Sequence, residues 1–196
     1  MPIIKPKAPT GDFQLNNINL NKEVIMSLVI KEENKQYPIP DEGIYNAVAV
    51  DVVDIGTVET PWGPKEKISI MFELDAEGED GNRFVVGRRF TKSLNKKSNL
   101  YKTLTQWRSR KFKPHELKNG FDLESLIGVS AIVYISHNET DKRTYANLES
   151  ILPPEKGKDG NPQWFVTRPS GQYIRVIERE NYQEPEEYSE SLKETG

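Results

Sequence analysis

The sequence predicts a mainly β domain of five strands, with one helix between the third and the fourth strand. Apolar and polar side chains alternate in residues 44–53 and most regularly in 65–74, while apolar side chains recur at helical spacing in 96–110. Clusters of Gly, Pro, Asp and Asn separate these segments. Of the 196 residues, 35% are hydrophobic and 29% are charged, which suits one domain with poorly ordered extensions.

The first three strands are expected at 44–53, 65–74 and 83–91. The acidic turn 75–82 joins the second and third strands into a hairpin. Gly87, in the middle of the third strand, indicates a bulge or a close approach of the backbone. The side chains of the second strand that should face the core are Ile68, Ile70, Phe72 and Leu74.

The predicted helix spans about 96–110. Leu100, Leu104 and Trp107 follow one another at i, i+4 and i+7, which makes core packing the favoured role of Trp107. Pro114 prevents the helix from continuing, because a proline in a helix interior removes a hydrogen bond and clashes with the preceding turn.

Beyond this helix, a short second helix is expected at 122–127, followed by strands at 129–136 and 143–151. The resulting order, three strands, a helix and two strands, is that of the OB-fold, a five-stranded Greek-key barrel. Such barrels bind oligonucleotides on the face of strands two and three and with the loops that follow strands one and four.

Four parts of the chain are predicted. Residues 1–42 form an N-terminal arm with one short apolar element at 24–30, which either adds a strand or mediates self-association. The barrel occupies 43–153, and 154–177 form a linker and a small hairpin. Residues 178–196 carry seven acidic and two basic residues without periodicity, which predicts a disordered acidic tail.

Positive charge is concentrated in residues 83–113, which contain eleven Lys or Arg and no Asp or Glu. The whole chain has 27 basic and 30 acidic residues, so the rest has 16 basic against all 30 acidic ones, a formal charge of −14. Aromatic residues lie among these cations. Because cations neutralise phosphates and aromatic rings stack on unpaired bases, the segment predicts binding of single-stranded nucleic acid.

Candidate binding residues fall into three groups. Cations of the third strand would form a phosphate track, a helix flank would extend it, and Trp62 in the TPWGPK loop would stack on a base. Each group has a plainer interpretation: a solvated strand or helix face, or a tryptophan folded onto the barrel end. Which of Arg88 and Arg89 faces outward stays open at this point. The candidates are Trp62, Lys65, Lys67, Arg83, Arg88, Arg89, Lys92, Lys97, Tyr101 and Arg108.

Catalytic chemistry is not expected. The chain has no cysteine, its two histidines, His115 and His137, lack a metal-ligand spacing, and no phosphate-binding, hydrolase or metalloprotease motif is present. We therefore expect no enzyme, no cofactor and no metal. No apolar run approaches 18 residues, so we expect no membrane segment and a cytoplasmic protein.

The stretch 43–153 resembles the OB-fold single-stranded DNA-binding proteins of bacteriophages and related mobile elements. The motifs that carry the resemblance are GIYNAVAVDV, the Trp-Gly-Pro loop leading to KISIMFEL, and RRFTKSLNKKSNLYKTLTQWRSRKF followed by DLESLIG. It implies that Arg83, Arg88, Arg89 and Trp62 belong to the binding face, and that the acidic C-terminus recruits replication or repair proteins. This chain departs from the pattern by ending Lys-Glu-Thr-Gly, where many such tails end in a bulky hydrophobic residue.

The expected function is sequence-nonspecific binding of single-stranded DNA in phage-type replication or recombination. The expected partners are single-stranded DNA and, through the tail, replication or recombination proteins. The tail is alternatively a solubilising extension or a decoy for the basic surface. Two other functions remain open, namely a barrel that docks an acidic replisome or virion protein, and an RNA binder. The sequence leaves the oligomeric state and the preference for DNA or RNA undecided.

Overall fold

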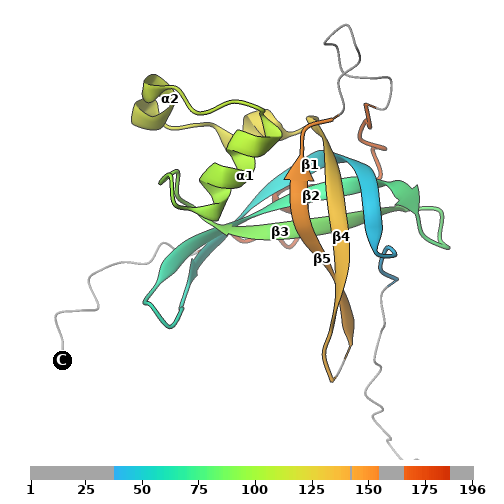
Figure 1. Ribbon diagram of the computed structural model, residues 1–196. Coiled ribbons are helices and arrows are strands. Elements are labelled where there is room, and N and C mark those ends of the chain that lie inside the picture. Colours follow the sequence, from blue (N-terminus) through green and yellow to red (C-terminus); the bar gives the residue numbers. More distant parts are fainter. Residues whose placement is uncertain (1–37, 142, 155–165, 186–196) are drawn as a thin grey trace, which may run out of the picture. The chain divides into compact units, whose positions relative to one another are not determined.

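The computed structural model describes residues 38–141, 143–154 and 166–185, which form a mainly β domain (Figure 1). The expected arm with its element at 24–30, most of the linker, and residues 186–196 of the expected tail lie outside these ranges. The elements in chain order are β1 (Gly43–Val58), β2 (Lys65–Glu77), β3 (Arg83–Thr91), α1 (Asn99–Trp107), α2 (Pro114–Asn119), the 3-10 helix η1 (Leu123–Leu126), β4 (Ser130–Glu139), β5 (Thr144–Leu152) and the 3-10 helix η2 (Val176–Glu178).

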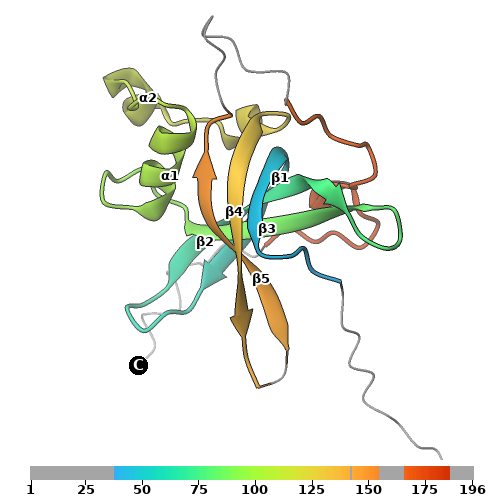
Figure 2. The ribbon, with the colours of Figure 1, turned by 45° about the vertical axis from the view of Figure 1, so that its right-hand side comes forward.

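The five strands form one antiparallel sheet in the order β3-β2-β1-β4-β5. The central strand β1 serves two partners, because its beginning pairs with β4 and its longer remainder pairs with β2. The two edge strands, β3 and β5, also contact each other (Figures 1 and 2). The sheet therefore curls around its own apolar face. The expected five strands and their order along the chain are confirmed.

The hairpin of β1 and β2 is longer than the sequence suggested. The strand β1 continues to Val58 instead of ending at 53, and it stays paired with β2 as far as Val58 opposite Lys65. A register shift between Asp54 and Gly56 makes this continuation possible. Gly56 adopts φ +76°, a conformation that suits glycine, and its N–H donates to Asp54 Oδ1 at 2.9 Å. Gly56 thus lies at a bulge within a strand, in a stretch that the sequence predicts as a loop.

The core lies between the curled sheet and α1. The four side chains of β2 expected to face inward are buried. Ser98 caps α1 by accepting a hydrogen bond from the backbone N–H of Tyr101 at 3.1 Å. Trp107 is 3% exposed, its ring centroid lies 5.2 Å from that of Phe72, and its Nε1 donates to the carbonyl of Ser130 at 2.8 Å. Trp107 is therefore a core residue that fastens α1 to the start of β4.

The connection between α1 and β4 contains a helix that the sequence analysis missed. Pro114 ended the predicted helix, but it also begins α2, because proline is well suited to the first turn, where its missing N–H is not needed. The segment expected as a helix at 122–127 is the 3-10 helix η1. Asp122 is its N-cap, because its side chain accepts a hydrogen bond from the backbone N–H of Glu124. None of the helices in the described ranges is long and apolar enough to cross a membrane.

The C-terminal part departs most from expectation. The hairpin predicted at 164–177 is wrong for the described residues 166–177, which contain no strand and end in η2. Residues 166–185, called the strap below, are irregular and lie against the outer face of the sheet (Figure 2). Their polar groups bond to β1, β2 and β4 instead of pairing with one another across a hairpin. The strap is thus part of the domain that was expected to end at 153.

Candidate nucleic-acid interface

The strand β3 places Arg88 and Arg89 on opposite faces of the sheet. Arg88 shares its side with the buried Phe90, its Nη1 donates to the carbonyl of Glu149 on β5, and its guanidinium lies 5.4 Å from the Phe90 ring. Arg89 lies opposite Ser69 on the outer face and is exposed. No hydrogen bond or ion pair joins the Arg89 side chain to another residue of the described ranges. Arg89 is therefore the arginine of this pair that is available to a ligand.

Gly87 does not form a bulge, because its pairing with Met71 keeps the register of its neighbours. Its role is a close approach: a Cβ added to Gly87 would lie 2.6 Å from Met71 Sδ and 3.1 Å from Ser69 Oγ. The Met71 side chain thus lies over the backbone of β3 at Gly87. The sequence predicted a bulge or a close approach of the backbone here, whereas the atoms that come close to Gly87 belong to the side chains of Met71 and Ser69.

Several cations meet where β2 begins and β3 ends. Lys67 pairs with Thr91, and its Nζ donates to Thr91 Oγ1 at 2.8 Å. Lys65, Lys67 and Ser69 occupy every second position of β2 and therefore lie on the same face. Arg89 is opposite Ser69, so Lys65, Lys67 and Arg89 share the outer face. Lys92 follows β3 and forms an ion pair with Asp54 at 2.8 Å. The exposed Lys97 follows five residues later, just before α1.

Trp62 lies beside these cations in the turn that joins β1 to β2. Thr60 Oγ1 donates to the carbonyl of Gly63 at 2.6 Å, and the Gly63 N–H donates to the carbonyl of Thr60 at 2.9 Å. Gly63 has φ +89°, which completes a tight turn. The Trp62 side chain is 85% exposed, so it is not folded onto the barrel end. We name the set Trp62, Lys65, Lys67, Arg89 and Lys97 the basic end.

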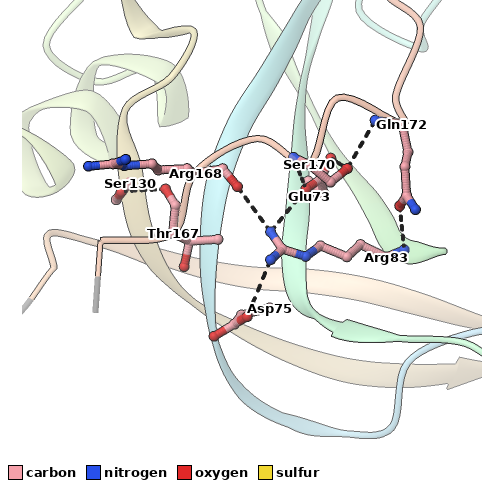
Figure 3. A network of polar contacts seen from close by, with 8 residues as sticks. All are labelled: Glu73, Asp75, Arg83, Ser130, Thr167, Arg168, Ser170 and Gln172. Carbon is pink, nitrogen blue, oxygen red and sulfur yellow. Dashed lines mark hydrogen bonds and ion pairs between the residues drawn. The ribbon is translucent and has the colours of Figure 1, made fainter. Parts of the chain in front are cut away.

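Arg83, the first cation expected in the phosphate track, takes part in an internal network instead (Figure 3). Its Nη1 donates to Glu73 Oε1 at 3.2 Å and to the carbonyl of Arg168 at 3.0 Å, and its Nη2 lies 3.8 Å from Asp75 Oδ1. The Glu73 carboxylate is 1% exposed and also accepts hydrogen bonds from the N–H and the hydroxyl of Ser170, at 2.8 and 2.9 Å. Arg83 therefore compensates a buried carboxylate beneath the strap.

A second buried carboxylate, Asp51 of β1, lies under the next part of the strap. It is 0% exposed and accepts hydrogen bonds from Arg175 Nε at 3.1 Å, the Tyr173 hydroxyl at 3.2 Å and the Val176 N–H at 2.8 Å. Burial and the neighbouring Asp51 charge raise the pKa of Tyr173 to about 12. The strap thus covers the part of the outer face that holds Asp51 and Glu73, whereas none of its hydrogen bonds within the described ranges reaches the basic end.

The helix flank expected to bind nucleic acid is largely occupied by internal contacts. Tyr101 is 9% exposed, and its ring centroid lies 5.3 Å from that of Phe112. The guanidinium of Arg108 lies 4.4 Å from the Phe112 ring and forms an ion pair with Glu116. Glu116 also accepts from Arg110, and these bonds hold the pKa of its carboxyl far below the usual range. Of the three residues expected on this flank, Lys97 alone is exposed in the described structure.

No protein-family model matches this chain, and a search of curated proteins finds no significant match.

The buried carboxylates predict a stability contrast between two arginines of the strap. Arg175→Met removes the cation nearest to Asp51 and leaves a buried carboxylate without its charge partner, so the free energy of unfolding should fall by about 2–3 kcal/mol. Arg168→Met is the matched control, because only the backbone carbonyl of Arg168 takes part in the network. Urea unfolding followed by circular dichroism measures both variants. Equal stability of the two variants would show that the Asp51 contacts contribute little.

Proposed function

We propose that this protein binds single-stranded DNA without sequence specificity and that its sheet is an OB-fold barrel. The support for the fold is topological. An OB-fold barrel opened between its third and fifth strands has the order β3-β2-β1-β4-β5, with its helix between the third and fourth strands. The contact between β3 and β5 is where such a barrel closes.

The observation that carries the proposed function is the exposed Trp62 beside the cations of the basic end. An exposed tryptophan in a tight, hydrogen-bonded turn offers a base a rigid aromatic surface, and stacking of this kind contributes about 1–3 kcal/mol per base. Lys65, Lys67 and Ser69, the residue opposite Arg89, follow one another at every second position of β2, so the three cations share one face in a row suited to successive phosphates. Stacking and phosphate contacts do not read base edges, so the binding is nonspecific.

The strap limits the path that single-stranded DNA can follow over the sheet. Beneath it lie Asp51 and Glu73, whose carboxylates would repel phosphates if they were uncovered. The DNA therefore follows the part of the outer face that the strap leaves uncovered, from the Trp62 turn across Lys65, Lys67 and Arg89 towards Lys97. This path uses five of the ten residues expected from the sequence. The other five, Arg83, Arg88, Lys92, Tyr101 and Arg108, make contacts within the protein.

Pro185, the last described residue of the strap, lies close to this path. Pro185 lies so near Gly56 that a Cβ added to Gly56 would come within 2.7 Å of Pro185 Cβ, and Gly56 is paired with Lys67. Residues 186–196 contain four Glu and one Lys. A tethered acidic segment has a high local concentration, so even weak contacts with the basic end compete with DNA.

Trp62→Ala should weaken binding of a fluorescein-labelled dT30 oligonucleotide by about 5- to 150-fold, the equivalent of one lost stacked base. Trp62→Phe keeps an aromatic face and should retain most of the affinity. Ile44→Ala, which shortens another exposed apolar side chain, is the surface control. Fluorescence anisotropy measures all three variants. If no variant binds differently from the unsubstituted protein, Trp62 is not a stacking platform. If the unsubstituted protein does not bind dT30 at all, the proposed function is wrong.

Adjacent arginines allow a second, charge-matched comparison. Arg89→Gln removes an outward cation and should reduce the dependence of log K on log salt by about 0.7, the value for one phosphate contact on a single strand. Arg88→Gln removes the same charge from an inward position and should leave the salt dependence unchanged. Binding of dT30 is titrated between 50 and 300 mM NaCl. Equal slopes for the two variants would place the phosphate path elsewhere.

Removing residues 186–196 should tighten dT30 binding at 50 mM NaCl and have little effect at 300 mM, because added salt screens the competition. The truncation begins after Pro185 so that the strap and its contacts with Asp51 stay complete. A variant with the four Glu of this segment replaced by Gln is the length-matched control, and it should behave like the truncation. Unchanged affinity at low salt in both variants would reduce this segment to a solubilising extension.

A further inference from the structure

A groove lies between the end of the strap and the second half of β1. It encloses about 980 Å³ and is open to solvent. Its apolar lining comes from both elements and includes Ile55 of β1 and Ile174, Val176, Tyr182 and Pro185 of the strap. This volume lies at the upper end of what small-molecule sites enclose, and an open groove of this size suits a short peptide segment.

The strap holds apolar side chains out of the core at this place. Ile174 is 60% exposed and Ile177, on η2, is 48% exposed. Their positions are set by polar contacts: the Val176 N–H donates to the buried Asp51, and the Arg179 guanidinium donates to the carbonyl of Ile174 at 3.3 and 3.2 Å. Neighbouring exposed apolar side chains on a pre-ordered surface are typical of sites that bind another macromolecule.

The charge around the groove selects the kind of partner. Three carboxylates, those of Asp54, Glu178 and Glu180, line it against one cation, Arg179, whose guanidinium donates to the Ile174 carbonyl and lies 5.6 Å from the Tyr173 ring. Carboxylates at this position repel a polynucleotide, and they also repel the acidic residues 186–196 of the chain itself. A peptide that combines apolar side chains with Lys or Arg is complementary to both features.

We propose that this groove docks a basic, apolar peptide segment of a partner protein. The wall of the groove includes Asp54, which forms an ion pair with Lys92. This ion pair lies between the groove and the basic end. None of the residues of the basic end lines the groove. The proposal rests on the groove alone and stands whether or not the basic end binds DNA.

The test begins with selection of random dodecapeptides displayed on phage against the full chain. A selected peptide is then labelled with fluorescein, and its binding is measured by anisotropy. We expect the selected peptides to pair apolar residues with Lys or Arg. Ile174→Asp should weaken binding by at least about tenfold, as expected when a central apolar contact is lost. The double variant Glu178→Lys, Glu180→Lys should weaken it similarly by reversing the charge.

Ile44→Asp is the matched control, since Ile44 is 74% exposed at the start of β1 and does not line the groove. Binding of dT30 by the Ile174→Asp variant should equal that of the unsubstituted protein, which separates this proposal from the proposed function. Thermal melting checks that each variant is folded, and the charge-reversal variant decides the outcome if Ile174→Asp is not. The proposal is overturned if no peptide is enriched, if enriched peptides lack net positive charge, or if the groove variants bind as well as Ile44→Asp.

Discussion

The architecture depends on two carboxylates that are buried on the outer face of the sheet. Asp51 and Glu73 lie on neighbouring strands, and neither is accessible to solvent. A buried ionised carboxylate costs several kcal/mol unless charges and hydrogen bonds compensate it. Here the strap supplies Arg175, Tyr173 and the Val176 N–H to the first, and Ser170 to the second. The sheet and the strap therefore require each other, and the position of the strap is specified by directional bonds as well as by apolar contact.

This constraint explains why positive charge in the sequence differs from positive charge on the surface. The segment 83–113 contains eleven cations, but part of them serves the fold. Arg83 neutralises Glu73, Arg88 joins β3 to β5, and Arg108 and Arg110 hold Glu116 at the start of α2. Lys92 is paired with Asp54. The cations on the open outer face are consequently fewer, and they gather where β2 begins and β3 ends.

The strands and α1 follow from the sequence because their signals are local. Alternation in β2 places Ile70 and Phe72 in the core, and the same rule applied to β3 would have put Arg88 on the side of the buried Phe90. The strap was not predictable in this way. Alternation assigns Glu73 to the outer face, where a carboxylate in a strand is normally solvated. Asp51 shares the parity of the core residues Ala47 and Ala49, and it reaches the outer face through the register shift between Ala49 and Asp51. The partners that the strap supplies to the two carboxylates lie 97 to 125 residues further along the chain, and no periodic pattern records such a pairing.

The site was predicted only in part, for a related reason. Trp62, Lys65 and Lys67 were identified because they are close in sequence, and they are also close in the fold, since a hairpin keeps sequence neighbours together. Tyr101 and Arg108 were assigned to a binding flank by helical spacing, which locates a face but does not say what covers it. That face is covered by Phe112 and Glu116, which follow the break at Ser109, a residue with φ +53° that turns the chain back onto α1.

The bulge of β1 at Gly56 links the two surfaces proposed to bind ligands, namely the basic end and the groove. Gly56 lets β1 continue beyond Asp54, so the hairpin of β1 and β2 extends to Val58 and carries the Trp62 turn away from the core. It also leaves no side chain where Pro185 approaches, so the strap ends against the same strand. The residue thereby places the aromatic turn, the lysines of β2 and the apolar groove around one stretch of β1. A side chain at position 56 would disturb the bulge and the strap together, whereas a change at Trp62 or Ile174 alters one surface alone.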